Sequence, residues 1–236
     1  MRGVSEFELA GAFSGNRLEG NPGIGFRRAL RHGENGMTRR LLFLPGAGAD
    51  PDFWKPLGNL LPDTWEKIYF GWPGLGNQKR DPAINCLDDL VTLVEESLCY
   101  SPVDLLAQSM GGSVAVRLLL KHPEKIRRVV FTATGAGLPM ADYGGADWKT
   151  EYQKKYPEAS LWFVNENRDF TPEIPKISQP ILIFCGDADD ICPLAVGKRL
   201  VALYPNANLE IVPGGDHIFA HDRPQKIVEA IRSHLR

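Results

Sequence analysis

Cysteine and long apolar runs are both scarce in this 236-residue chain. The four cysteines are Cys86, Cys99, Cys185 and Cys192, and no two of them have C-x-x-C spacing. They are too few and too scattered for a disulfide scaffold, a zinc motif or a thioredoxin-like motif. No apolar run is long enough to span a membrane, and the first 16 residues lack the apolar stretch of a signal peptide. We therefore expect a cytoplasmic protein with reduced thiols and no membrane partner.

A surplus of charge of one sign is also missing. Lys and Arg total 27 against 29 Asp and Glu, which gives a formal net charge of −2. This balance argues against a chain built around nucleic acid, so we expect no nucleic-acid partner. Hydrophobic residues make up 43% of the chain, as in ordinary soluble domains. The length fits one large domain or two small ones.

Short apolar runs alternate with longer amphipathic stretches from residue 40 onward. The runs predict strands at 40–44, 67–70, 103–107, 128–132, 181–185 and 208–212, and helical spacing predicts helices at 87–98, 111–122, 194–203 and 224–235. This alternation predicts an α/β fold with a doubly wound, mostly parallel sheet. Residues 1–36 leave two interpretations open, either edge strands at 7–9 and 24–30 or a flexible leader. With those two strands the sheet has eight, which is the architecture we expect.

Residues 135–179 interrupt the alternation with 45 residues that contain no clear strand. Seven of these 45 residues are aromatic, which is a larger share than the 9% of the whole chain. A long excursion inside a compact domain is usually functional, so we interpret it as a cap, or lid, over a site. A surface insertion that buries its own aromatic side chains is the alternative. We expect Trp148, Trp162 and Phe163 to line an apolar substrate pocket.

The segment 107–111, Ala-Gln-Ser-Met-Gly, lies between an expected strand and an expected helix. This is the context of a nucleophile elbow, G-x-S-x-G, with Ala107 in place of the first glycine. The serine of such a turn has a strained backbone, so the residues two before and two after it must be small. The turn predicts an exposed, nucleophilic hydroxyl on Ser109.

A serine needs a base to take its proton at neutral pH. Among the five histidines, His217 directly follows the strand expected at 208–212, and open α/β sheets place their sites at such strand ends. We expect His221, four residues later, to contribute to the substrate pocket, with simple solvent exposure as the alternative. The pair lacks the glutamate of an H-E-x-x-H motif, so we expect no metal.

The imidazole in turn needs a carboxylate to orient it. Three aspartates compete in the loop after the strand expected at 181–185, and we prefer Asp189, with Asp187 and Asp190 as alternatives. An oxyanion hole needs two N–H donors, and Met110 and Ala47 are the candidates. Ala47 lies in a loop of small residues that lacks the Lys-Ser/Thr pair of a P-loop, and we expect no cofactor.

These segments resemble the α/β-hydrolase superfamily over nearly the whole chain. The segment 42–47 resembles the family's strand and HG loop, with Pro45 in place of the usual His, and 71–77 resembles its D-x-P-G-x-G-x-S segment, with Gly71 in place of the Asp. The segment 186–193 matches G-x-x-D-x-x-x-P, whose fourth residue is the family's triad acid, and 214–224 is similar to the family's His loop. The resemblance implies one α/β-hydrolase domain over residues 1–236, a cap at 135–179 and a triad of Ser109, His217 and Asp189.

The resemblance also implies an activity. We expect a serine hydrolase that cleaves a small to medium carboxylic ester or thioester through an acyl-enzyme. Carbon–carbon bond hydrolysis, or a lyase step of the menaquinone-pathway type, uses the same triad and is an alternative. A ligand receptor with slow or no turnover is a third hypothesis. The expected partner is a small ester, free or linked to a carrier protein, and the protein is expected to be a monomer or a homodimer.

Overall fold

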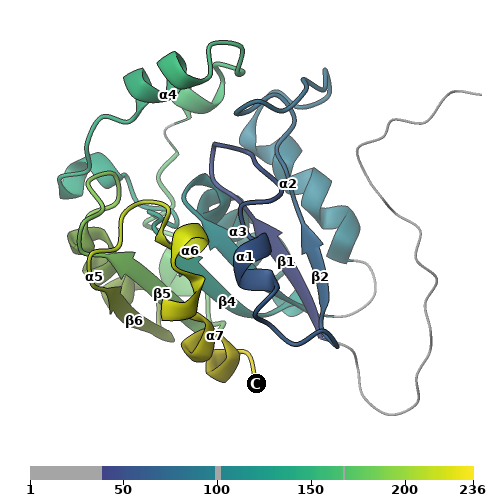
Figure 1. The fold of residues 1–236 in the computed structure, drawn as a ribbon, viewed down its shortest axis with the longest axis vertical. Coiled ribbons are helices and arrows are strands. Elements are labelled where there is room, and N and C mark those ends of the chain that lie inside the picture. Colours follow the sequence, from purple (N-terminus) through teal and green to yellow (C-terminus); the bar gives the residue numbers. More distant parts are fainter. Residues whose placement is uncertain (1–38, 99–101, 167) are drawn as a thin grey trace, which may run out of the picture. The chain divides into compact units, whose positions relative to one another are not determined.

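The computed structural model of the chain describes residues 39–98, 102–166 and 168–236. Its strands form one parallel sheet in the order β2-β1-β3-β4-β5-β6 (Figure 1). They are β1 (Arg40–Leu44), β2 (Glu66–Tyr69), β3 (Val103–Gln108), β4 (Ile126–Thr132), β5 (Ile181–Gly186) and β6 (Ala207–Val212). All six strands expected after residue 40 are confirmed. The sheet expected to have eight strands has six within the described residues, because the two edge strands expected at 7–9 and 24–30 lie outside them.

The α-helices are α1 (Lys55–Gly58), α2 (Leu87–Glu95), α3 (Met110–Lys121), α4 (Lys149–Lys155), α5 (Leu194–Leu203), α6 (Phe219–Asp222) and α7 (Val228–His234). The helices expected at 111–122 and 194–203 are confirmed. The helix expected at 87–98 ends as a 3₁₀ turn, η1 (Glu96–Leu98), and the one expected at 224–235 begins with another, η6 (Pro224–Lys226). In the part of the chain that the structure describes, no helix combines the length and the apolar character needed to cross a bilayer.

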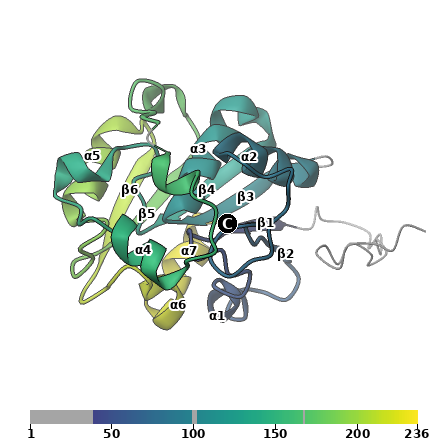
Figure 2. The same ribbon diagram turned by 90° about the horizontal axis from the view of Figure 1, so that it is seen from above.

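Alternating side chains of the strands divide the core into two layers. Leu42 and Leu44 of β1 pack on the face covered by α2, α3 and α5, whereas Leu41 and Phe43 pack on the face covered by α1, α6 and α7. Figure 2 shows these two sets of helices on opposite sides of the sheet. Strands with both faces buried read as continuous apolar runs, which explains why the sequence pattern locates them well.

The connections place a crevice at the carboxyl end of the sheet. From β1 the chain crosses to β2 at one side and then returns to β3 at the other side of β1. The loops after β1 and β3 therefore diverge, and open α/β sheets bind ligands where this occurs. The segment 135–179 contains, among its described residues, only α4 and the 3₁₀ turns η3 (Met140–Tyr143), η4 (Phe163–Asn165) and η5 (Ile174–Lys176). Its helix α4 lies beyond the carboxyl ends of the strands (Figure 1).

An ion-pair cluster lies at the amino-terminal ends of the strands. Asp104, near the start of β3, is fully buried, and its carboxylate accepts hydrogen bonds from Arg39 at 2.7 Å and from Arg127 at 2.8 and 3.2 Å. The two guanidinium groups compensate the buried charge, which would otherwise be costly. This cluster is at the opposite end of the strands from Ser109 and so belongs to the framework of the fold.

Candidate functional site

Ser109 occupies the single-residue corner between β3 and α3. Its φ of 50° and ψ of −123° lie outside the regions that L-residues normally adopt. Holding a serine there costs about 1–3 kcal/mol, so the surrounding structure must impose it. The Ser109 N–H donates to Thr132 O at 3.2 Å, and its carbonyl accepts from Thr134 Oγ1 at 2.6 Å and from Gly112 N at 2.9 Å.

Glycines permit the close packing around this corner. A side chain at Gly111 would overlap the main-chain carbonyl oxygens of Leu44 and Pro45, so the start of α3 lies directly on the end of β1. A side chain at Gly46 would meet the amide oxygen of Gln108 and lie 3.0 Å from the Ser109 Cβ. The requirement for a small residue two positions after the serine is confirmed, and its physical reason is contact with another strand's carbonyl groups.

The structure brings the predicted serine, histidine and aspartate together in one hydrogen-bonded row. Ser109 Oγ lies 3.0 Å from His217 Nε2, and His217 Nδ1 lies 2.9 and 3.1 Å from the two oxygens of Asp189. The Nδ1–H of the imidazole donates to the carboxylate, which leaves Nε2 to accept the serine proton. The arrangement can therefore take a proton from the hydroxyl as that oxygen attacks an electrophile.

The carboxylate of Asp189 is buried and fully hydrogen-bonded. Its side chain has 0% exposure, and its Oδ1 accepts the N–H groups of Ile191 and Cys192, each at 2.9 Å. Its Oδ2 faces the imidazole of His217, whose own side chain is 20% exposed. Because the loop after β5 turns its main chain around this one side chain, the carboxylate has a single orientation.

The two alternative aspartates lie elsewhere. Asp187 Oδ1 accepts the Gly214 N–H at 2.5 Å and so joins the loop after β5 to the loop after β6. Asp190 is exposed, and its main-chain carbonyl oxygen accepts the Ala146 N–H at 2.8 Å. The imidazole therefore contacts Asp189 and neither of its two neighbours.

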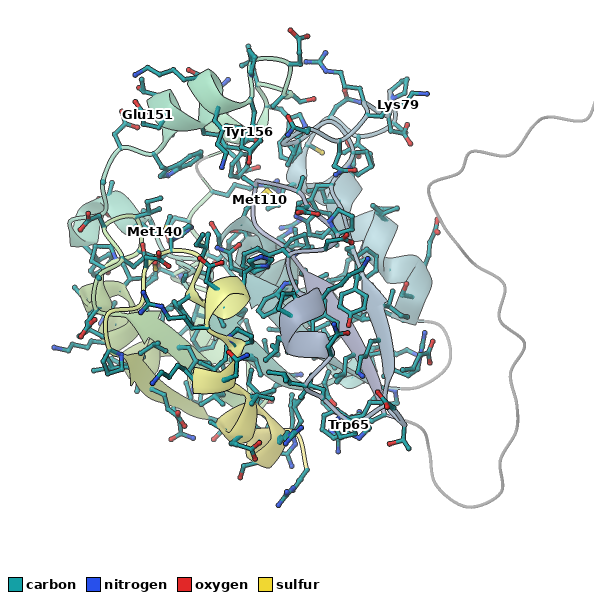
Figure 3. All side chains as sticks on the ribbon, viewed as in Figure 1. Trp65, Lys79, Met110, Met140, Glu151 and Tyr156 are labelled. Carbon is teal, nitrogen blue, oxygen red and sulfur yellow. The ribbon has the colours of Figure 1, made fainter. Side chains whose placement is uncertain are left out.

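The predicted oxyanion donors are on the loops that flank Ser109. Figure 3 shows Met110 at the carboxyl end of the sheet, on the side that faces Tyr156. Within the described part of the chain, neither the Met110 N–H nor the Ala47 N–H donates to a protein acceptor. Both groups are thus free to donate to a ligand. The loop that carries Ala47 is fixed by the Trp72 indole, which donates to Pro45 O at 2.8 Å.

Three of the residues predicted to line a pocket form an aromatic cluster. Trp148 stacks on Phe163 with ring centroids 5.1 Å apart, and Trp162 meets the edge of Phe163 at 6.1 Å. The cluster packs against the core layer that contains α2, α3 and α5. A cavity of about 490 Å³ adjoins Asp189, and its lining includes none of these three side chains. It is lined instead by Gly144, Ala146, Asp187, Asp190, Pro193 and Leu194 in addition to Asp189.

His221, the fourth predicted pocket residue, faces a different part of the protein. Its Nδ1–H donates to Phe53 O at 2.8 Å, and its ring stacks on that of Phe53 at 5.5 Å. These contacts join α6 to the loop that precedes α1. No hydrogen bond connects His221 with Ser109, His217 or Asp189.

The sequence did not predict a role for two residues that lie in the site. Gln108, the variable position of the elbow motif, donates from Nε2 to the carbonyl of His217 at 3.0 Å. Tyr152, one of seven aromatic residues in 135–179, bonds through its hydroxyl to Ala47 O and Gly76 N, each at 3.0 Å. Both contacts join segments far apart in the chain, and no local pattern indicates them.

Two buried thiols lie close to the row. Burial raises the pKa of Cys185 to about 12 and that of Cys192 well above its ordinary value, and the nearby charge of Asp189 adds to both shifts. These thiols are therefore neutral at physiological pH and are poor nucleophiles. Among the residues that the structure describes, no group of three or more His, Cys, Asp or Glu side chains is placed to hold a metal ion.

The chain is similar to known proteins in sequence and in fold. Residues 39–170 match the model of a family described as the alpha/beta hydrolase fold. The poly(3-hydroxyalkanoate) depolymerase of Ectopseudomonas oleovorans is 26% identical, over 89% of this chain and 88% of its own length. The pimeloyl-[acyl-carrier protein] methyl ester esterase of Neisseria meningitidis is 32% identical, over 44% of this chain and 40% of its own length. The structure of an esterase from Exiguobacterium antarcticum shares the fold, with a TM-score of 0.71, 18% identity and coverage of 85% and 93%.

Proposed function

Because the chain belongs to the α/β-hydrolase fold family, we propose that it is a serine hydrolase that cleaves a small to medium carboxylic ester or thioester. The observation that carries the proposal is the row from Ser109 Oγ through the His217 imidazole to the buried Asp189 carboxylate. The names of the relatives support the class of bond, since they include an esterase and a depolymerase.

The reaction follows from this row and proceeds in two halves. His217 Nε2 takes the proton of Ser109 as Oγ attacks the carbonyl carbon of the ester, and the Asp189 carboxylate stabilises the imidazolium that forms. The tetrahedral oxyanion accepts hydrogen bonds from the Ala47 and Met110 N–H groups. The imidazolium then protonates the leaving alcohol or thiol, which leaves an acyl-enzyme. Water, deprotonated by His217, attacks the acyl carbon. The bond from that carbon to Ser109 Oγ then breaks, His217 returns the proton to Oγ, and the acid is released.

The segment 135–179 is proposed as a small cap over this centre. Its helix α4 lies beyond the carboxyl ends of the strands (Figure 1). The hydroxyl of Tyr152, a residue of α4, donates to Ala47 O. A carrier-linked ester is included in the proposed class, because the name of the Neisseria relative specifies one.

Substitution of Ser109 tests the proposal most directly. We expect Ser109→Ala to abolish hydrolysis of p-nitrophenyl butyrate and covalent labelling by a fluorophosphonate probe, with an unchanged circular dichroism spectrum. Ser113→Ala is the matched control, because Ser113 lies farther along α3 and has no part in the row. Undiminished hydrolysis by Ser109→Ala would overturn the proposal. Labelling of the native protein without turnover of any ester would favour the carbon–carbon hydrolase or lyase alternatives, and failure to label would favour the receptor.

A further inference from the structure

The hydroxyl of Tyr152 connects three segments of the chain. It donates to Ala47 O at 3.0 Å, in the loop after β1, and accepts from Gly76 N at 3.0 Å, in the loop after β2. Tyr152 itself lies in α4 of the segment 135–179. One phenolic oxygen thus holds two loops that border the site and attaches both of them to α4.

The two loops are also in direct contact with each other. Gly76 has a φ of +53°, and a side chain there would overlap the carbonyl group of Gly48. The loop after β2 has a second hydrogen bond to the segment 135–179, in which the Ser160 N–H donates to Gly74 O at 2.7 Å. The Tyr152 hydroxyl is therefore placed where the main chain of both loops is closely packed.

The main chain on both sides of Ala47 is anchored. Gly46 O accepts the Ala49 N–H at 3.0 Å, which orients the peptide group that contains the Ala47 N–H. Ala47 O belongs to the next peptide group, and its hydrogen bond from Tyr152 orients that one. With both adjoining peptide planes held, the direction of the Ala47 N–H is set.

We propose that Tyr152 is a positioning residue for the oxyanion hole, because it holds the main chain of Ala47 so that the N–H of Ala47 points to the developing oxyanion. The inference rests on the proposed function. A donor that is out of place by a fraction of an ångström loses much of its effect on the transition state, while ground-state binding changes little. Tyr152 acts without touching the reacting atoms.

The protonation state of Tyr152 suits this role. Burial raises the pKa of the Tyr152 hydroxyl, so the phenol stays protonated over the pH range of an esterase assay. The proton donates to Ala47 O, and a lone pair accepts from Gly76. Loss of the hydroxyl would leave both main-chain groups without this partner.

Two tyrosines of the same segment provide a matched pair of variants. Tyr152→Phe removes the bonding hydroxyl and keeps the ring contacts with Trp148 and Phe163, so we expect it to fold. Tyr156→Phe is the control. Its ring lies 5.0 Å from that of Tyr152, but within the described residues its hydroxyl makes no hydrogen bond.

The kinetic readout separates positioning from simple binding. For p-nitrophenyl butyrate we expect Tyr152→Phe to lower kcat roughly 10- to 100-fold, with KM changed by less than about 3-fold. Inhibition by an alkyl trifluoromethyl ketone, which forms a tetrahedral adduct with the serine, should weaken by about the same factor as kcat/KM. Tyr156→Phe should leave all three values within about 2-fold of the starting protein. A loss confined to KM, or equal losses in both variants, would overturn the inference.

Hydrogen exchange provides a readout that does not depend on activity. Exchange of the Gly76 amide should be about 2- to 10-fold faster in Tyr152→Phe and unchanged in Tyr156→Phe. Unchanged Gly76 exchange in Tyr152→Phe would refute the positioning role of Tyr152.

The Ser109→Ala variant separates the positioning proposal from the hydrolase proposal. If Ser109→Ala abolishes hydrolysis while Tyr152→Phe retains full kcat, the positioning role fails and the hydrolase proposal stands. If Ser109→Ala retains full activity, the hydrolase proposal fails.

Discussion

The hydrogen bonds around Asp189 determine how the Asp189→Asn substitution changes the tautomer of His217. Oδ1 of Asp189 accepts two main-chain N–H groups, from Ile191 and Cys192, so an asparagine must place its carbonyl oxygen there. Its amide nitrogen then takes the position of Oδ2, which faces His217 Nδ1 at 2.9 Å. The amide donates to Nδ1, and the imidazole proton is forced onto Nε2.

That change of tautomer sets the size of the effect. With a proton on Nε2, the imidazole donates to Ser109 Oγ over 3.0 Å and has no lone pair left to take the serine proton. The corresponding substitution in a serine protease lowers kcat by about 10⁴. We expect a loss of the same order here, equivalent to about 5.5 kcal/mol of transition-state stabilisation. The protein should still fold, because asparagine matches the shape of aspartate and keeps both main-chain bonds.

The assay compares three variants on p-nitrophenyl butyrate. Asp189→Asn should lose about four orders of magnitude in kcat. Asp190→Asn and Asp187→Asn should stay within about 10-fold of the unchanged protein, since neither side chain contacts the imidazole. Retention of more than about a tenth of kcat in Asp189→Asn would refute the reasoning, as would a larger loss in either neighbour.

Two further predictions concern stability. Asp104→Asn should destabilise the fold by about 3 kcal/mol and lower Tm by about 6–12 °C, because it removes the charge that Arg39 and Arg127 share. Ester hydrolysis below Tm should not change, and a thermal scan with an activity assay checks both expectations; an unaltered Tm would contradict the first. Cys185, with a pKa raised to about 12, should make the free energy of unfolding fall as pH rises from about 9 to 12, because only the unfolded thiol ionises in that interval. Urea titrations across this range should show the fall and should show less of it in Cys185→Ala; an equal fall in both proteins would contradict the assignment.

Long buried strands and helices could be predicted from the pattern of residues in the sequence. Strand β5 has six buried positions in a row, and helix α2 buries four residues at helical spacing. The short length of the first run favours a strand, and the spacing in the second favours a helix. The helices α1 and α6 have four residues each and no recognisable period. Their formation depends on the core layer that they cover, which is assembled from distant parts of the chain.

Local sterics and periodicity account for what could be derived from the order of residues: the parallel sheet, the order of its elements and the tight corner at Ser109. The strands, the helices and the corner depend on neighbours within a few positions along the chain, and the alternation of strand with helix implies the parallel sheet. The contact of His217 with Asp189, and not with two adjacent carboxylates, depends on how two loops meet across the end of the sheet. The same is true of the bonds that Tyr152 makes to Ala47 and Gly76, and of which side chains line the cavity. Such contacts join residues tens of positions apart, so they follow from the packing of the folded chain. The family pattern at 186–193 indicated Asp189, whereas no local pattern indicated the bonds of Tyr152 or the lining of the cavity.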